Sequence, residues 1–234
     1  MDLAEVLAVL ERQGTEANRR ATARHGVFAE MYGVSFTALR NVAKRIGRDD
    51  ALAVALWDTA NHDARILATM VLDERTPNLE MLRRWASECD SYIQADAVSS
   101  FLARTNVAQE CADLWADEEH DFVGQIAWNL VAQLAARGSK TSEDWYRAKL
   151  DVIGAELQKR GNRTRHAMNG ALIAIGIAFD ALRDRALAVA AQVGRVEVDH
   201  GLTGNRTPEA GPSIRRSLVR KAPSGRAGDA EPAD

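Results

Sequence analysis

Apolar residues recur every three to four positions along most of the chain, from the first residues to about Val193. This spacing places apolar side chains on one face of an α-helix, so it predicts a succession of amphipathic helices. Glycine and proline stand at the breaks between them, and Asp49, Asn61, Asp90 and Asn162 are typical N-cap residues. The predicted helices span residues 3–13, 16–25, 36–46, 50–59, 62–72, 79–88, 91–104, 108–116, 119–135, 143–159, 163–178 and 181–192.

Tryptophans recur at nearly even intervals, and two of them belong to the same short sequence motif, which we call the tryptophan phrase. Leu-Trp at Trp57 is followed after four residues by a His-Asp pair at His62, and Leu-Trp at Trp115 by one at His120. Trp85 heads a looser copy. Each copy combines the end of one helix, a polar turn and the start of the next, and such repeats of roughly 30 residues are typical of α-solenoids. We therefore predict an all-α fold over residues 1–205, an α-solenoid of antiparallel helix pairs curved around a concave face.

The composition fits closely packed helices, since Ala, Leu and Val dominate and aromatic residues are few. The formal net charge is −3, so any basic binding surface must be local. Cys89 and Cys111 form neither a disulfide framework nor a metal-ligand spacing, which favours a reduced, cytoplasmic setting. The N-terminus lacks the pattern of a signal peptide, and no apolar stretch is long enough to span a bilayer. No phosphate loop, nucleophile elbow or zinc motif is present, so we expect no cofactor and no metal.

The helix at 91–104 has an unusual polar face. Tyr92, Asp96, Ser99 and Ser100 lie on it, and only one of these residues is charged. Asp96 follows Tyr92 by one helical turn, so their side chains are neighbours. A lone carboxylate beside an aromatic ring is either a functional site on a concave surface or a mid-helix Asp that bonds an adjacent helix end.

The helix at 119–135 is almost free of charge after Asp121. Gln125 and Asn129 lie one turn apart on it, close to Trp128. They form either a buried amide pair between repeats or an accessory part of a site.

Cations crowd the first turn of the helix that begins near Asn162, where the helix dipole disfavours them. Arg163, Arg165 and His166 stand there, and Asn169 lies one turn beyond Arg165. One interpretation is that a phosphate binds at this helix end. The other is that the cations pair with acids on the preceding helix, such as Asp151 or Glu156.

Further cations occur on separate repeats. Arg40, Lys44 and Arg48 form a ridge at helical spacing, and Arg65 shares a face with His62. Such clusters are either solvated helix faces or parts of a basic lane that tracks a nucleic-acid backbone. The second interpretation assigns DNA contacts to Arg40, Lys44, Arg65, Arg163, Arg165 and Asn169.

After Gly201 polar and turn-forming residues replace the helical pattern, so we predict a disordered tail over 206–234. His200, in the run Asp199-His200-Gly201, is either part of a polar site or in a turn that closes the last repeat. The tail is either a solvated terminus or an aid in holding an acidic polymer. From Thr207 on, it carries Arg215, Arg216, Arg220, Lys221 and Arg226.

Two stretches of the chain resemble the N-terminal half of bacterial DNA alkylation repair proteins, the HEAT-like-repeat DNA glycosylases. They are residues 32–44 (YGV…LRNVAK) and 52–68 (LA…LW…HDARILA), and the resemblance covers about residues 15 to 205. It implies that a monomer grips alkylated duplex DNA on its concave face and removes cationic N-alkylated purines without a base-flipping pocket. It also implies that Asp96 stabilises an oxocarbenium-like transition state and orients water, while Tyr92 faces the cationic nucleotide in the place usually taken by Trp.

Two positions depart from the family's pattern. Active members carry an Arg about where Gly124 and Gln125 stand, and a second aromatic where Asn169 and Gly170 stand. Three hypotheses follow: an alkylpurine DNA glycosylase, a non-catalytic HEAT-like module that binds DNA or protein, and a pure scaffold. Arg40, Lys44, Arg65 and Arg165 on one face with Asp96 would argue against a scaffold.

Overall fold

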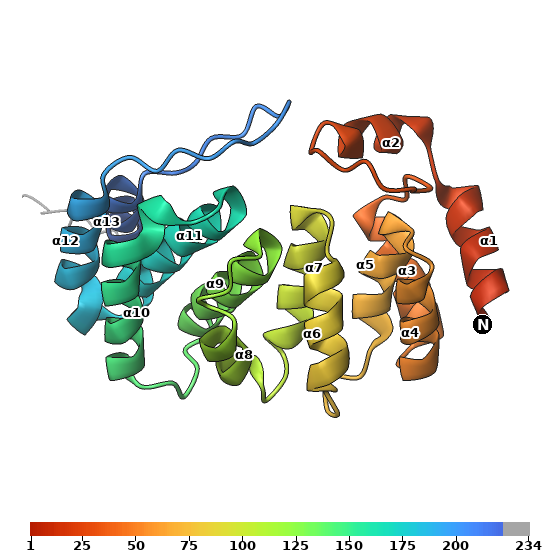
Figure 1. The fold of residues 1–234 in the computed structure, drawn as a ribbon, viewed down its shortest axis with the longest axis horizontal. Helices are drawn as coiled ribbons and strands as arrows, with labels where there is room; N and C mark the ends of the chain where they lie inside the picture. The colour runs from red at the N-terminus through yellow and green to blue at the C-terminus, as the bar shows by residue number, and fades with distance from the viewer. Residues whose placement is uncertain (222–234) are drawn as a thin grey trace, which may run out of the picture.

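The computed structural model describes residues 1–221, which fold into a stack of helices (Figure 1). Within this part of the chain every regular element is a helix, so the predicted all-α fold is confirmed. The α-helices are α1 (Leu3–Gln13), α2 (Glu16–Ala23), α3 (Phe36–Ile46), α4 (Asp50–Asp58), α5 (His62–Val71), α6 (Leu79–Glu88), α7 (Tyr92–Leu102), α8 (Ala108–Leu114), α9 (Asp121–Ala136), α10 (Glu143–Glu156), α11 (Asn162–Ala178), α12 (Arg183–Val193) and α13 (Ala210–Lys221).

Every second helix belongs to a continuous row. Helices α3, α5, α7, α9, α11 and α13 contact one another in that order, while α4, α6 and α8 pack against α5, α7 and α9 from behind. This is the arrangement of an α-solenoid, in which each repeat buries its apolar face against its neighbours. We call the hollowed surface of α3, α5, α7, α9 and α11 the inner face.

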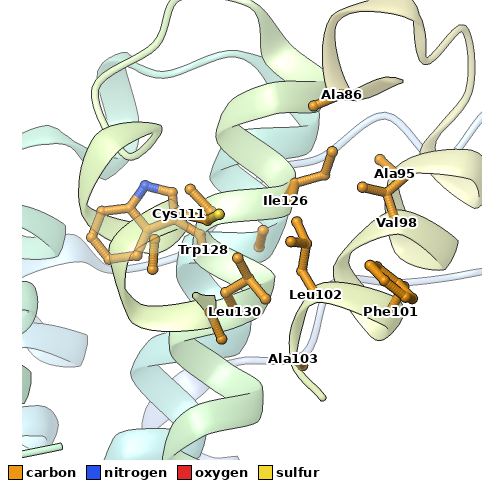
Figure 2. Packing of buried hydrophobic residues seen from close by; sticks show 14 of the residues in the cluster. Ala86, Ala95, Val98, Phe101, Leu102, Ala103, Cys111, Ile126, Trp128 and Leu130 are labelled. Carbon is orange, nitrogen blue, oxygen red and sulfur yellow. The ribbon is translucent and has the colours of Figure 1, made fainter. Parts of the chain in front are cut away.

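Tryptophans join the helices at the repeat boundaries. The rings of Trp57 and Trp85 stack with centroids 4.3 Å apart and planes 3° from parallel. The indole nitrogen of Trp57 also donates a hydrogen bond of 2.7 Å to Glu88. Figure 2 shows the next layer, where Ile126 and Leu102 meet between α7 and α9. The Trp57 phrase therefore connects α4 to the following repeat through a buried contact.

Helices α9 and α11 approach each other closely at Gly124. A Cβ at this position would lie 2.4 Å from the hydroxyl oxygen of Thr164, so any larger residue would push the helices apart. The family's Arg therefore has no room at position 124. Gly170, in contrast, has open space where its Cβ would stand.

Most helix ends fall within three residues of the predicted ends. Helix α10 ends earlier than predicted because a 3₁₀ turn follows it at Leu157–Lys159. Helix α12 starts later than predicted because a 3₁₀ turn precedes it at Asp180–Leu182. Asp49 and Asn61 cap α4 and α5 as predicted. The N-caps predicted at Asp90 and Asn162 are corrected: Ser91 caps α7, and Gly161 occupies that position before α11.

The tail contains a helix that the sequence pattern did not predict. Residues 206–234 were expected to be irregular, yet α13 covers Ala210–Lys221. Ile214 is fully buried, and a Cβ added at Gly176 of α11 would lie 2.6 Å from its terminal methyl group. This long-range contact stabilises a helix whose first turn contains Gly211 and Pro212. Arg226 and the rest of residues 222–234 lie outside the described part.

The segment between α12 and α13, residues 194–209, extends far from both helices (Figure 1, blue). It runs over α11 toward α2, and a Cβ on Gly201 would lie 3.3 Å from the carbonyl oxygen of Arg24. The two ends of the stack therefore meet above the inner face.

Candidate nucleic-acid interface

Asp96 occupies the middle of the inner face, on α7. One oxygen of its carboxylate accepts hydrogen bonds of 2.8 Å from the side-chain amides of Gln125 and Asn129 on α9. Desolvation in this hollow raises the pKa of Asp96, while the bonds from Asn129 and Gln125 and the charge of Arg163 oppose the rise. The second oxygen has no protein partner among the described residues. Gln125, which is 3% exposed, and the half-buried Asn129 thus bond Asp96 across two helices and line the same hollow, while their accessory role in a site stays a prediction.

Tyr92 lies one turn before Asp96 and is held on two sides. Its hydroxyl is hydrogen-bonded to Nδ1 of His25, which follows α2. The guanidinium carbon of Arg163, on α11, sits 4.1 Å from the centre of its ring. Burial raises the pKa of Tyr92, with Arg163 opposing the shift. A cation of the protein therefore already occupies one face of the ring.

These side chains line a hollow of about 370 Å³, which we call the Asp96 hollow. It opens between α7, α9 and α11 and is covered by the segment 194–209. The lining residues are Tyr92, Asp96, Gln125, Asn129, Arg163, His166, His200, Asn205 and Arg206.

Two histidines form one wall of the Asp96 hollow. The rings of His166 and His200 are perpendicular with centroids 5.4 Å apart, and His200 Nε2 lies 2.9 Å from the hydroxyl of Thr207. Desolvation lowers the pKa of both, and the neighbouring Arg163 adds to this. Both imidazoles are therefore biased toward the neutral form, which can donate or accept a hydrogen bond. His200 thus lines the hollow, while its role in a polar site stays a prediction.

A second hollow of about 540 Å³ adjoins the first, and Asp96 lines both. We call it the Phe36 groove, after the aromatic residue at its edge on α3. Arg40 and Lys44 of α3 and Arg104, in the turn after α7, stand around it. Two of the predicted DNA contacts, Arg40 and Lys44, therefore share a surface with Asp96.

Arg65 does not belong to this surface. It is 9% exposed, and its guanidinium donates hydrogen bonds to the carbonyl oxygens of Trp57 (3.3 Å) and Glu88 (2.9 Å). Arg65 shares a face of α5 with His62, but at these two positions that face is buried. The expectation of a free cation at Arg65 is corrected.

The start of α11 also differs from both sequence interpretations. Asp121 of α9 accepts hydrogen bonds of 2.8 Å from the backbone N–H groups of Arg163 and Thr164. The N–H groups at this helix end therefore bind a carboxylate of the protein, at the place where a phosphate was one interpretation. The partner of the helix end is Asp121, not Asp151 or Glu156.

Two residues of α11 that were assigned to DNA contacts lie next to the segment 194–209, and one of them is bonded to it. Asn169 is 1% exposed and donates a 2.9 Å hydrogen bond to the carbonyl oxygen of Pro208. Arg165 donates to the carbonyl oxygen of Arg160 at 3.3 Å and lines the space beneath the segment. Asn169 is buried away from any ligand, so its assignment as a contact is corrected.

Sequence reasoning missed His25, Arg104 and Arg206. Arg206 comes from an irregular segment, where no periodicity indicates which way a side chain points. His25 was expected at the end of the helix 16–25, but α2 ends at Ala23 and His25 lies in the turn after it, where helical phase no longer applies. Arg104 is the last residue of the predicted helix 91–104, one helical turn after Ser100. Helical phase therefore places it on the same polar face as Ser100 and could have found it.

Within residues 1–221, no group of three or more metal-ligating side chains could hold an ion. No helix of this part is long and apolar enough to cross a membrane.

Comparison with known proteins assigns the fold and the family. One solved structure superposes with a TM-score of 0.85 and 27% sequence identity, covering 94% of this chain and 95% of that one. It is described as one of a new family of proteins related to the HEAT-like repeat DNA glycosylases with affinity for branched DNA structures. The chain belongs to the DNA alkylation repair enzyme family, which matches residues 6–203.

Two bacterial relatives are similar over most of their length. The uncharacterized protein Lin0241 of Listeria innocua is 26% identical over 195 residues, which are 82% of this chain and 85% of that protein. The uncharacterized protein Lmo0209 of Listeria monocytogenes is 25% identical with the same coverage.

Proposed function

We propose that the protein binds DNA along its inner face, with the sugar-phosphate backbone passing Asp96. The observation that carries this proposal is the concentration of cations around Asp96 in a chain whose net charge is −3. Arg40, Lys44 and Arg104 stand in the Phe36 groove, and Arg163 and Arg206 in the Asp96 hollow. Such a local patch attracts phosphates by counterion release, whatever the base sequence.

The similarity to a protein with affinity for branched DNA supports the same conclusion and suggests the kind of DNA. That protein matches this chain over nearly its whole length. We therefore propose that junctions and other branched DNA bind more tightly than plain duplex.

Charge reversal of Arg40 tests this proposal, with Arg45 as its matched control. Both are exposed residues of α3, but only Arg40 lines the groove. Fluorescence anisotropy with a four-way junction and a duplex should show about a tenfold loss of affinity for Arg40→Glu. Arg45→Glu should stay within about threefold of the wild type. Equal losses in both variants would mean that the inner face does not bind the DNA.

Hydrolysis of an N-glycosidic bond is a second candidate function, favoured by the open oxygen of Asp96. An N-alkylated purine carries a positive charge and leaves as a neutral base, taking the electron pair of the C1′–N bond. Asp96 would stabilise the resulting oxocarbenium charge and accept a proton from the water that adds to C1′. The raised pKa of Asp96 suits proton acceptance.

The arrangement around Tyr92 argues against a role for its ring in this hydrolysis. Arg163 covers a face of Tyr92, so a cationic nucleotide would have to displace a guanidinium to stack there. We therefore rank DNA binding above hydrolysis. Release of alkylated base from methylated duplex, compared between wild type and Asp96→Asn, separates the two. No release by the wild type, with junction binding intact, would leave a binding protein without glycosylase activity.

A further inference from the structure

The Phe36 groove combines an apolar floor with a cationic rim. Ala43, Met70, Ile93 and Ala97 are partly buried side chains that pack on the core and form its floor. Its volume of about 540 Å³ is within the usual range of roughly 300–1,000 Å³ for small-molecule sites. A ligand that fills this groove on the proposed DNA-binding face would therefore combine a flat, apolar surface with an anionic group.

The cations of the groove are available to such an anion. Within residues 1–221, none of Arg40, Lys44 and Arg104 forms an ion pair, whereas Arg48 and Arg84, outside the groove, are paired with carboxylates. Arg104 is steadied by a 2.7 Å hydrogen bond to the carbonyl oxygen of Ser100, which leaves its other N–H groups free. The rim therefore carries three cations without an ion-pair partner among the described residues, beside the single carboxylate of Asp96.

Phe36 adds an aromatic surface. Its side chain is 51% exposed, which is unusual for a residue of this size. The guanidinium carbon of Arg40 lies 4.7 Å from the ring centre, so Arg40 covers one face of the ring and a base would stack on the other. Aromatic rings interleaved with cations are the arrangement by which proteins hold single strands, because bases stack on the ring while phosphates meet the charges.

We propose that the Phe36 groove holds one unpaired nucleotide of a DNA strand, with its base on the apolar floor beside Phe36 and its phosphate between Arg40 and Lys44. This inference rests on the proposed DNA binding and names the feature of branched DNA that is recognised. A paired base has both faces stacked and its edge bonded to a partner, so it cannot lie on the floor. Nucleotides at a branch point are free to do so.

The same site should accept any of the four bases. The hydroxyl of Thr69 is bonded to the carbonyl oxygen of Ile66 at 2.8 Å, and one oxygen of Asp96 is taken by two amides. Few polar groups remain to read a base edge. Recognition then depends on stacking and charge, which tolerate all bases.

The experiment fills the groove and removes its ring. Ala97→Phe places a bulky side chain on the floor, and Ala155→Phe is the matched control on an exposed position of α10. Phe36→Ala removes the stacking surface from an exposed position, so it should not disturb folding. Binding of a short fluorescent oligothymidine and of a fully paired duplex is measured for each protein.

We expect Ala97→Phe to weaken oligothymidine binding about tenfold and Phe36→Ala about fivefold, in the range of one lost base stack. Duplex affinity should change by less than about twofold, and Ala155→Phe should behave as wild type.

Unchanged oligothymidine affinity in both groove variants would overturn the proposal while leaving DNA binding intact. Wild-type binding of duplex without oligothymidine would do the same. Failure to bind any DNA would reject both proposals together. Competition by polyglutamate as strong as by oligothymidine would assign the groove to an acidic peptide and also overturn the inference.

Discussion

Two amides of α9 point at the carboxylate of Asp96 and oppose the rise of its pKa that desolvation causes. The bonds from Asn129 and Gln125 favour the ionised form, while desolvation raises the pKa. Replacing Asn129 by Ala removes one of these bonds and should raise the pKa of Asp96 further. A carbon-detected NMR titration of the carboxyl group measures this change directly.

Asn106→Ala provides the control, because Asn106 is an exposed loop residue away from both hollows. Its effect on the Asp96 titration should be negligible. An unaltered pKa in Asn129→Ala would mean that the amide does not govern the carboxylate, and the Gln125–Asp96–Asn129 arrangement would lose its chemical significance.

His62 should make the protein sensitive to mild acid. It is 2% exposed at the start of α5, and desolvation lowers its pKa below 6.5. As the pH falls through 6.5, the unfolded chain takes up a proton that the folded chain resists, so stability decreases. One such group contributes at most about 1.4 kcal/mol per pH unit.

Urea denaturation at pH 7.5, 6.5 and 5.5 measures this dependence for the wild type and for His62→Gln. His166 and His200 also have lowered pKa values, so the variant should lose part of the dependence, not all. His120→Gln, at an exposed histidine, should retain the wild-type slope. If the His62→Gln and wild-type slopes coincided, His62 would not be the acid-sensitive group.

At the level of elements, the Asp of the repeated His-Asp phrase ties neighbouring repeats together through backbone N–H groups. Asp63 accepts three such bonds from residues 32–34, and Asp121 accepts two from the first turn of α11. Asp121→Ala should lower the free energy of unfolding by about 1–2 kcal/mol, as loss of an N-cap does.

Thermal or urea unfolding tests the effect, with Asp117→Ala as control. Asp117 forms an exposed ion pair with Arg160, so its loss should cost less than about 1 kcal/mol. Asp121→Asn keeps one acceptor and should fall between Asp121→Ala and the wild type. Equal stability of Asp121→Ala and the wild type would show that α11 does not need this cap.

The sequence was sufficient for what depends on local periodicity. Helix positions, the Trp57 phrase and the Tyr92–Asp96 spacing all follow from the 3.6-residue repeat and from capping chemistry. What it could not supply depends on contacts between distant segments. The burial of Arg65, the docking of Ile214 and the approach of His25 to Tyr92 each join residues from different repeats. Helical phase on one segment does not determine which neighbour covers it.

At the level of the whole molecule, charge is distributed unevenly. The chain is acidic overall, and many of its surface cations are paired with carboxylates, as Arg84 is with Asp58 and Arg185 with Asp151. The cations of the two hollows form no ion pair within residues 1–221. The proposed binding mode therefore depends on a small number of phosphate contacts on one surface, and that number can be measured.

The dependence of DNA affinity on salt counts these contacts. Each phosphate neutralised contributes about −0.9 to the slope of log K against log salt. Contacts through Arg40, Lys44, Arg104, Arg163 and Arg206 predict a slope between about −4 and −5 for duplex.

The double variant Arg40→Ala/Lys44→Ala should reduce the magnitude of this slope by about 2. Arg12→Ala/Arg45→Ala removes the same charge from exposed positions outside both hollows, where no phosphate contact is expected, so it should leave the slope close to that of the wild type. Equal slopes for the two double variants would mean that DNA affinity depends only on the net charge of the protein. The inner face would then be rejected as the DNA-binding surface.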